Sequence, residues 1–122
     1  MYNVVLLTRR DEDLAEFIQA LSTAPDVTLK VLADPDAVLE LVRSDHPHLV
    51  ILDQGYEKPL DLVVAILTID AMVNTTMITS MDAETWHEKS EGLGMMEPVP
   101  DPPAAIDADA LLTALRGMPG LS

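Results

Sequence analysis

Several residue types that serve common functions are missing or scarce in this sequence of 122 residues. It contains no cysteine, which excludes disulfide bonds, thiolate metal sites and a cysteine nucleophile. One Trp, one Phe and two Tyr are too few for the aromatic platforms on which nucleic-acid bases stack. Seven Lys and Arg stand against 21 Asp and Glu, so the net charge is −14. Because such a surface repels phosphate backbones and anionic lipids, we expect protein partners, with no nucleic acid and no membrane.

Long apolar runs and a basic N-terminal region are missing as well. No apolar stretch is long enough to cross a bilayer, and residues 1–4 lack the positive charge that begins a signal peptide. We therefore expect a cytoplasmic protein. The length suits a single domain over residues 1–122 with its own hydrophobic core, and we expect no output domain.

The most informative stretch lies near the middle of the chain. Residues 48–52 are almost uniformly apolar and lead directly into one carboxylate, Asp53. This pattern is typical of a strand that is buried on both faces and places an acid at its C-terminal end. In open α/β sheets, ligands and chemistry gather at that end. The alternative is that Asp53 only caps the strand or begins a turn.

The other segments alternate between strand and helix patterns. Strands are predicted over residues 2–7, 27–32, 48–53, 76–79 and 93–97. Helices are predicted over residues 11–23, 35–45, 60–72 and 82–91, with a last one capped by Asp107 and ended by Gly117 and Pro119. The short links between these elements favour parallel strands with right-handed crossovers. The predicted fold class is therefore α/β, with five βα units.

The third predicted helix, residues 60–72, has almost no polar face. A helix that docks on a sheet needs one apolar stripe, and four side chains have the right spacing for it: Leu60, Val63, Val64 and Leu67. This assignment leaves Leu62, Ile66 and Ile69 on another face, where we predict an interface for a homodimer or a partner protein. The alternatives are that a neighbouring helix covers these three residues or that the segment is irregular.

The (βα)5 order, together with the sequence from Pro47 to Asp53, resembles the receiver domain of two-component response regulators over nearly the whole chain. The resemblance implies a flavodoxin-like, doubly wound sheet with strand order 2-1-3-4-5. It also implies that Asp53 stands at the position that accepts a phosphoryl group in that family. Thr79 and Ser80 then match the switch Thr or Ser and the small residue after it, at the end of the fourth strand.

Two parts of the family's pattern differ in this chain. Where the family has a pair of acids that hold a divalent ion, the sequence has Thr8, Arg9 and Arg10. Magnesium requires hard oxygen ligands, and an arginine repels it. One hypothesis is that a guanidinium fills the metal pocket and pairs with Asp53, and the alternative is that both arginines are solvated charges. Asp11 and Asp13 could supply ligands only from a remodelled loop, and they are better explained as acids at a helix N-terminus.

The second difference concerns the lysine that the family has at the end of the fifth strand, followed by a cis-proline. Two registers are possible here, Val99-Pro100 and Ala104-Ala105, and neither supplies an ammonium group. Met96 falls where the family has its switch aromatic residue. The three histidines, His46, His48 and His87, have no metal-ligand spacing, and we expect them to be structural.

These observations support two main functional hypotheses. The first is a stand-alone atypical receiver domain, a protein-interaction module in phosphorelay signalling with no enzymatic activity, no cofactor and no metal. Its partner would be a histidine kinase, a phosphotransfer protein or a downstream effector. The second is a genuine phosphoacceptor, phosphorylated on Asp53 by a histidine kinase through a rearranged site that uses Mg²⁺. A domain that binds a small ligand is a third hypothesis, but the sequence has no glycine-rich first loop to support it.

Overall fold

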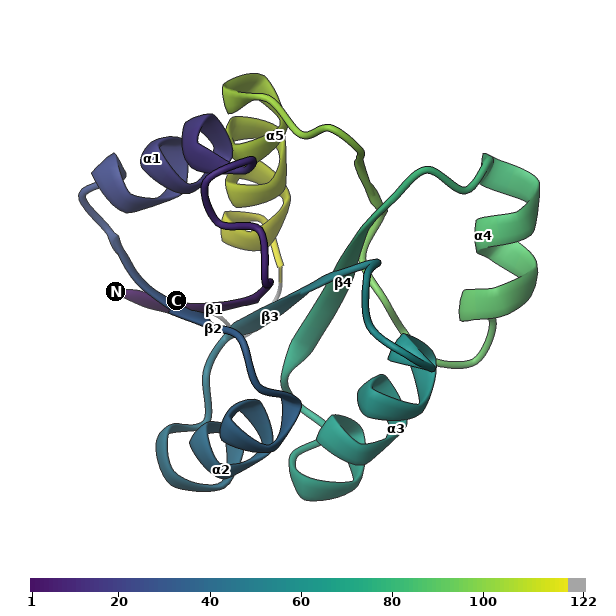
Figure 1. Ribbon diagram of the computed structural model, residues 1–122. Coiled ribbons are helices and arrows are strands. Elements are labelled where there is room, and N and C mark those ends of the chain that lie inside the picture. Colours follow the sequence, from purple (N-terminus) through teal and green to yellow (C-terminus); the bar gives the residue numbers. More distant parts are fainter. Residues whose placement is uncertain (119–122) are drawn as a thin grey trace.

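In the computed structural model, which describes residues 1–118, strands and helices alternate along the chain (Figure 1). The strands are β1 (Tyr2–Leu7), β2 (Val27–Leu32), β3 (Leu49–Asp53), β4 (Asn74–Thr79) and β5 (Val99–Pro100). The helices are α1 (Ala15–Thr23), α2 (Pro35–Asp45), α3 (Pro59–Ile69), α4 (Ala83–Ser90) and α5 (Ala105–Arg116). All strand pairs are parallel, and the sheet order is β2-β1-β3-β4-β5. The predicted fold class and strand order are confirmed.

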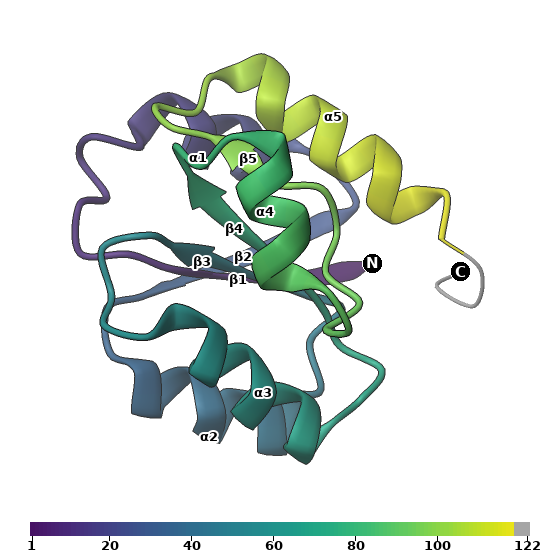
Figure 2. The ribbon, with the colours of Figure 1, turned by 90° about the vertical axis from the view of Figure 1, so that its right-hand side faces the viewer.

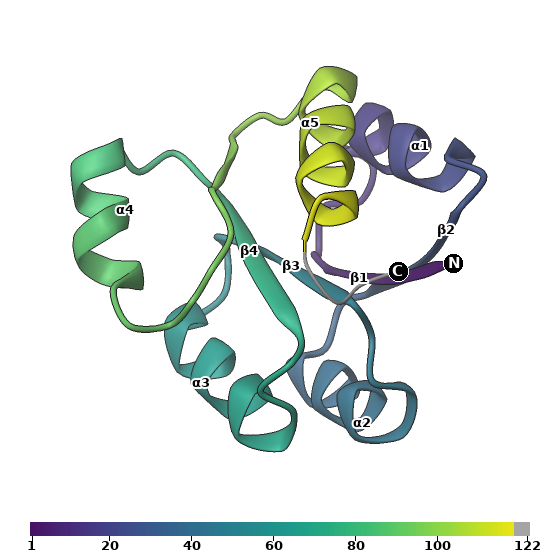
Figure 3. The ribbon, with the colours of Figure 1, turned by 180° about the vertical axis from the view of Figure 1, so that it is seen from behind.

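Helices cover both faces of the sheet. Figures 1 and 3 show α1 and α5 on one face and α2 and α3 on the other, and Figure 2 shows the sheet lying between these two layers. Successive residues of a strand point to opposite faces, so each central strand contributes to two cores. Leu49 and Ile51 belong to the core under α1 and α5, whereas Val50 and Leu52 belong to the core over α2 and α3.

The central strand β3 is buried on both faces along its whole length, as its uniform apolar sequence predicts. It pairs with β1 on one side and with β4 on the other, and Asp53 lies beside Ile78 in the β4 register. Because the strands are parallel, the ends of β1, β3 and β4 meet at one edge of the sheet. This arrangement places Asp53 at the end of the strand in the middle of that edge.

The fifth strand does not lie where the sequence predicts it. The segment 93–97 precedes the strand, and β5 consists of Val99–Pro100. Gly92 and Gly94 have positive φ values of 82° and 63°, so the chain turns at the predicted strand start. The Met96 amide still donates to the Thr75 carbonyl at 2.8 Å, which holds this segment against β4. Proline has no N–H to donate, which is why a proline-rich strand at the sheet edge stays short.

Some helix boundaries also differ from the prediction. The last helix begins at Ala105 rather than after an Asp107 cap, and Asp107 instead accepts the backbone N–H of Ala104 through Oδ2 at 2.7 Å. Gly117 follows the end of this helix, whereas Pro119 lies outside the described residues. Residues 11–14 form a turn before α1.

The burial of the side chains of α3 contradicts the predicted interface. Ile66 is fully buried at 0% exposure, and Leu62 and Ile69 pack partly buried against the same core. Val64, which the sequence places in the docking stripe, is 50% exposed. Nearly every position of this helix is apolar, so the pattern could not define which side faces the sheet. Of the predicted docking stripe, Val63 is fully buried, and Leu60 and Leu67 pack partly buried against the core as expected. The buried face also includes Ile66, with Leu62 and Ile69 partly buried, so the predicted interface at these three residues is wrong.

Among residues 1–118, no helix has both the length and the apolar composition needed to span a membrane.

Candidate functional site

The candidate site lies at the edge of the sheet where the strands end. Thr8 follows β1, Asp53 ends β3, Thr79 ends β4 and Asp101 follows β5. In a parallel sheet these positions converge, and this is the edge at which α/β proteins place their ligands. The side chains of Thr8, Asp53 and Thr79 are buried there.

Asp53 is only 2% exposed, and four hydrogen bonds reach its carboxylate. Oδ2 accepts from the Thr8 hydroxyl and from Arg10 Nε, both at 2.7 Å. Oδ1 accepts from Arg10 Nη2 at 2.7 Å and from the Gln54 backbone amide at 2.9 Å. The guanidinium of Arg10 therefore grips both oxygens of the carboxylate, the two-point geometry that makes arginine a strong partner for carboxylates.

The electrostatics of the pair favour its charged form. Burial by itself raises the pKa of Asp53, but the hydrogen bonds from Arg10 and Thr8 outweigh burial and hold its pKa below the usual value. The hydrogen bond to Asp53 raises the pKa of Arg10, against the opposing effect of burial. The pair therefore favours the ionised form of Asp53 and the charged form of Arg10.

A second acid completes the contacts of Arg10. Asp101 Oδ1 accepts from Arg10 Nη2 at 2.8 Å, and its Oδ2 accepts from Gln54 Nε2 at 2.6 Å. The peptide bond between Asp101 and Pro102 is cis. Of the two predicted registers for the end of the fifth strand, the structure has Val99-Pro100, whereas Ala104-Ala105 lies at the start of α5. Asp101 follows the strand, where the resemblance leads us to expect a lysine.

The two arginines have different roles. Arg10 supports the hypothesis that a guanidinium pairs with Asp53, whereas Arg9 turns outward, with its Cζ 4.1 Å from the centre of the Tyr56 ring. Tyr56 is held in place by its hydroxyl, which donates to the Ala33 carbonyl at 2.7 Å. Asp11 and Asp13 are exposed in the turn before α1.

Thr79 makes a local contact, whereas Ser80 is joined to the site through Gln54. The Thr79 hydroxyl accepts the backbone N–H of Met81 at 3.1 Å, and the Ser80 backbone N–H donates to Gln54 Oε1 at 3.0 Å. Gln54 therefore connects the end of β4 with Asp101. The sequence pattern does not single out Gln54 or Asp101, although the Asp-Pro pair at residues 101–102 is a signal for the second.

A cavity of about 330 Å³ opens beside these residues. It is lined by Thr79, Ser80, Met81, Pro98, Pro100 and Asp101. Asp53 is not among the lining residues, and its carboxylate is held by Thr8, Arg10 and the Gln54 amide.

The residues at this edge do not fit a divalent metal ion. A guanidinium stands between the two carboxylates of Asp53 and Asp101, and magnesium requires oxygen ligands without a competing cation. Within residues 1–118, no group of three or more His, Cys, Asp or Glu side chains could hold a metal. His46 Nδ1 lies 3.0 Å from Asp70 Oδ2, and His48 Nδ1 accepts the Asn3 backbone N–H, so both make structural contacts.

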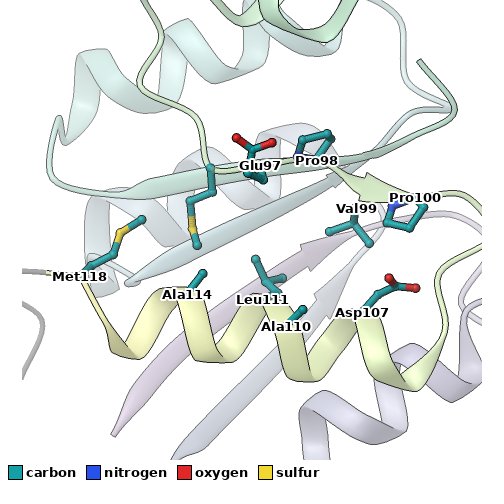
Figure 4. A pocket seen from close by; sticks show the side chains of 10 residues that line it. Glu97, Pro98, Val99, Pro100, Asp107, Ala110, Leu111, Ala114 and Met118 are labelled. Atoms are coloured by element: carbon teal, nitrogen blue, oxygen red, sulfur yellow. The ribbon is translucent and has the colours of Figure 1, made fainter. Parts of the chain in front are cut away.

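A separate apolar groove of about 270 Å³ lies between β5 and α5. Figure 4 shows Leu111 and Ala114 of α5 pointing toward the segment that carries Val99. Glu97 and Asp107 are also among the lining residues.

Comparisons with known proteins identify the fold. No protein family model matches the sequence, and no curated protein matches it. The chain is similar in structure to the chemotaxis response regulator CheY4 of Vibrio cholerae, with 13% identity, a TM-score of 0.80 and coverage of 94% of this chain and 98% of that one.

Two receiver domains of other proteins are similar as well. The signal receiver domain of the response regulator NarL from Mycobacterium tuberculosis has 18% identity, a TM-score of 0.76 and coverage of 96% and 98%. The receiver domain of an HD domain-containing protein from Pseudomonas fluorescens Pf-5 has 23% identity, a TM-score of 0.73 and coverage of 94% and 84%. At these identities the comparisons establish the fold, which is the CheY-like receiver fold that the resemblance predicted.

Proposed function

We propose that this chain is an atypical receiver domain, which acts as a protein-interaction module in two-component signalling without accepting a phosphoryl group on Asp53. The receiver fold supports the class of function. The observation that carries the finer proposal is the two-point ion pair between Arg10 and Asp53. Its partners would be a histidine kinase, a phosphotransfer protein or a downstream effector.

The contacts of Asp53 make it a poor nucleophile. An ionised carboxylate has about four acceptor positions, and hydrogen bonds from Thr8, Arg10 and Gln54 occupy two on each oxygen. To attack phosphorus, an oxygen would first have to release a donor that stabilises it inside the protein. Each release leaves a buried charge less well compensated, which opposes the reaction.

Charge compensation for the transferring group is reduced as well. The resemblance implies a metal ion and a lysine near the phosphoryl group, and this edge has Arg10 and Asp101 instead. Each lost contact of this kind raises a barrier by about 2.7–4 kcal/mol. Asp101 would also repel an incoming phosphate. A phosphoacceptor function would require Arg10 to leave Asp53 and a metal ion to replace it.

Acetyl phosphate with MgCl₂, followed by intact-protein mass spectrometry, tests the proposal. We expect no adduct on the wild-type protein, with a receiver domain that has an intact acid pair as the reagent control. Arg10→Ala tests whether the guanidinium is the barrier, because this variant frees both Asp53 oxygens from it. An adduct of one phosphoryl group on the wild type that disappears in Asp53→Asn would contradict the proposal and establish the phosphoacceptor function.

A further inference from the structure

A cleft between the beginning of α3 and the segment that contains α4 has properties that the site at Asp53 does not explain. Its volume is about 410 Å³. The lining residues are Lys58, Pro59, Leu60, Asp61, Met81 and Lys89. Figures 1 and 2 show α3 and α4 as neighbours on this side of the molecule. We refer to these six residues as the α3–α4 cleft.

Its two lysines differ from the other basic residues of the chain. Within residues 1–118, four basic side chains form ion pairs with acids, namely Arg10, Lys30, Arg43 and Arg116. Arg9 lies over the ring of Tyr56. Lys58 and Lys89 are exposed and make neither kind of contact among these residues, although the chain has three times as many acids as bases. Asp61 is the one carboxylate in the lining, so the cleft has a net positive charge.

The backbone of Lys58 is also unusual. Its φ of 50° and ψ of 56° place it in the left-handed region, which glycine and asparagine occupy more readily than lysine does. Its side chain makes no capping hydrogen bond to α3. The strain is therefore not offset by a visible structural role of the side chain, and such strain is often found at binding sites.

The floor of the α3–α4 cleft is apolar. Pro59, Leu60 and Met81 line it, and methionine adapts its shape to different apolar partners. A ligand that complements this cleft carries both an apolar group and negative charges. Carboxylate side chains around a leucine or a similar residue have this chemistry.

We propose that the α3–α4 cleft binds an acidic segment of a partner protein, with an apolar side chain on Leu60 and Met81 and carboxylates paired with Lys58 and Lys89. The proposal rests on the function proposed above only in that the domain binds a protein. It does not depend on the state of Asp53, so peptide binding and phosphorylation are tested separately.

The test is a titration of the isotopically labelled protein, followed by NMR, with the blocked peptide acetyl-Glu-Glu-Leu-Glu-Glu-amide. We expect saturable shifts at residues 58–61, 81 and 89, with a dissociation constant on the order of 0.1–1 mM, in the range of weak contacts. The variant Lys58→Glu/Lys89→Glu should weaken binding at least tenfold. The matched control, Lys30→Glu/Arg43→Glu, changes the net charge equally outside the cleft and should bind like the wild type.

A second peptide, with serine in place of leucine, tests the apolar floor and should bind at least fivefold more weakly. The proposal is overturned if the leucine peptide gives no saturable shifts, if the shifts lie elsewhere, or if both charge variants lose binding equally. Equal binding of the two peptides would also overturn it, because the apolar contact would then contribute nothing. None of these outcomes changes the expected result with acetyl phosphate, so a failure of one proposal is distinguishable from a failure of the other.

Discussion

Arg10 and Asp53 are 43 residues apart in the sequence, yet Nε and Nη2 of the arginine each lie 2.7 Å from a different oxygen of the aspartate. The pair joins the turn after β1 to the end of β3. Through Asp101 the same guanidinium also reaches the segment after β5. One side chain therefore links three chain segments at the edge of the sheet.

The first prediction is that Arg10→Gln destabilises the protein by about 2–3 kcal/mol. Removing one partner of a fully buried ion pair costs about 3–5 kcal/mol, and we expect less here because the Arg10 side chain is 32% exposed. The double variant Arg10→Gln/Asp53→Asn should recover part of the loss, because it also removes the buried charge of Asp53 that Arg10 compensates. Urea unfolding of the wild type, Arg10→Gln, Asp53→Asn and the double variant measures the coupling energy between the two side chains. The control is Arg43→Gln, which removes an exposed ion pair with Glu40 and should change the free energy of unfolding little. An equally small effect of Arg10→Gln would contradict the prediction.

The second prediction concerns pH. The pKa of Asp53 is lowered in the folded protein, chiefly because the hydrogen bonds from Arg10 and Thr8 overcome the effect of burial. A lowered pKa means that ionised Asp53 adds stability above its unfolded pKa of about 3.9, and that this contribution is lost as the pH falls through the folded pKa. The difference in unfolding free energy between wild type and Asp53→Asn should therefore shrink below about pH 4. A difference that stays constant or grows on acidification would show that Asp53 is not stabilised as an anion.

The third prediction is that the wild-type protein has no saturable Mg²⁺ site below about the millimolar range, in which weak divalent sites lie. Arg10 places a positive charge where a metal ion would need oxygen ligands. Arg10→Asp exchanges that charge for a carboxylate beside Asp53 and should gain binding. Titration with MgCl₂, followed by amide shifts at residues 8–10, 53 and 101, measures both proteins. Saturable binding to the wild type that Asp53→Asn abolishes would show the metal site to be intact.

The sequence predicts the centre of this fold better than its edge. The uniform apolar run before Asp53 has few interpretations other than a buried strand, and its position in the (βα)5 order places Asp53 at the sheet edge. The fifth strand is two residues long and contains a proline, so its register depends on backbone contacts such as Met96 to Thr75, which leave no mark in the pattern. Because the position of the fifth strand was not predicted from the sequence, Asp101 was not predicted as the second partner of Arg10. In α3 the sequence failed to show how wide the buried face is and that Val64 lies outside it, because a helix that is apolar on nearly all sides does not reveal its buried face.

The corrected orientation of α3 gives the fourth prediction, which compares two neighbouring positions of one helix. Ile66 is 0% exposed and belongs to the core that also contains Val42, Met77 and Trp86, whereas Val64 is 50% exposed. Ile66→Glu would bury a carboxylate with no partner and remove an aliphatic side chain from the core, at a cost of about 3–5 kcal/mol. Val64→Glu changes an exposed side chain to one with a higher helix propensity, so we expect a change within about 0.5 kcal/mol.

Urea unfolding monitored by circular dichroism measures both variants, and sedimentation velocity shows whether each retains the oligomeric state of the wild type. We expect Ile66→Glu to be largely unfolded or strongly destabilised, and Val64→Glu to fold normally. A folded Ile66→Glu protein with wild-type stability would place this residue at the surface and restore the interface that the sequence suggested. Loss of stability in Val64→Glu alone would indicate that α3 is rotated the other way, because only then would the side chain at position 64 face the sheet.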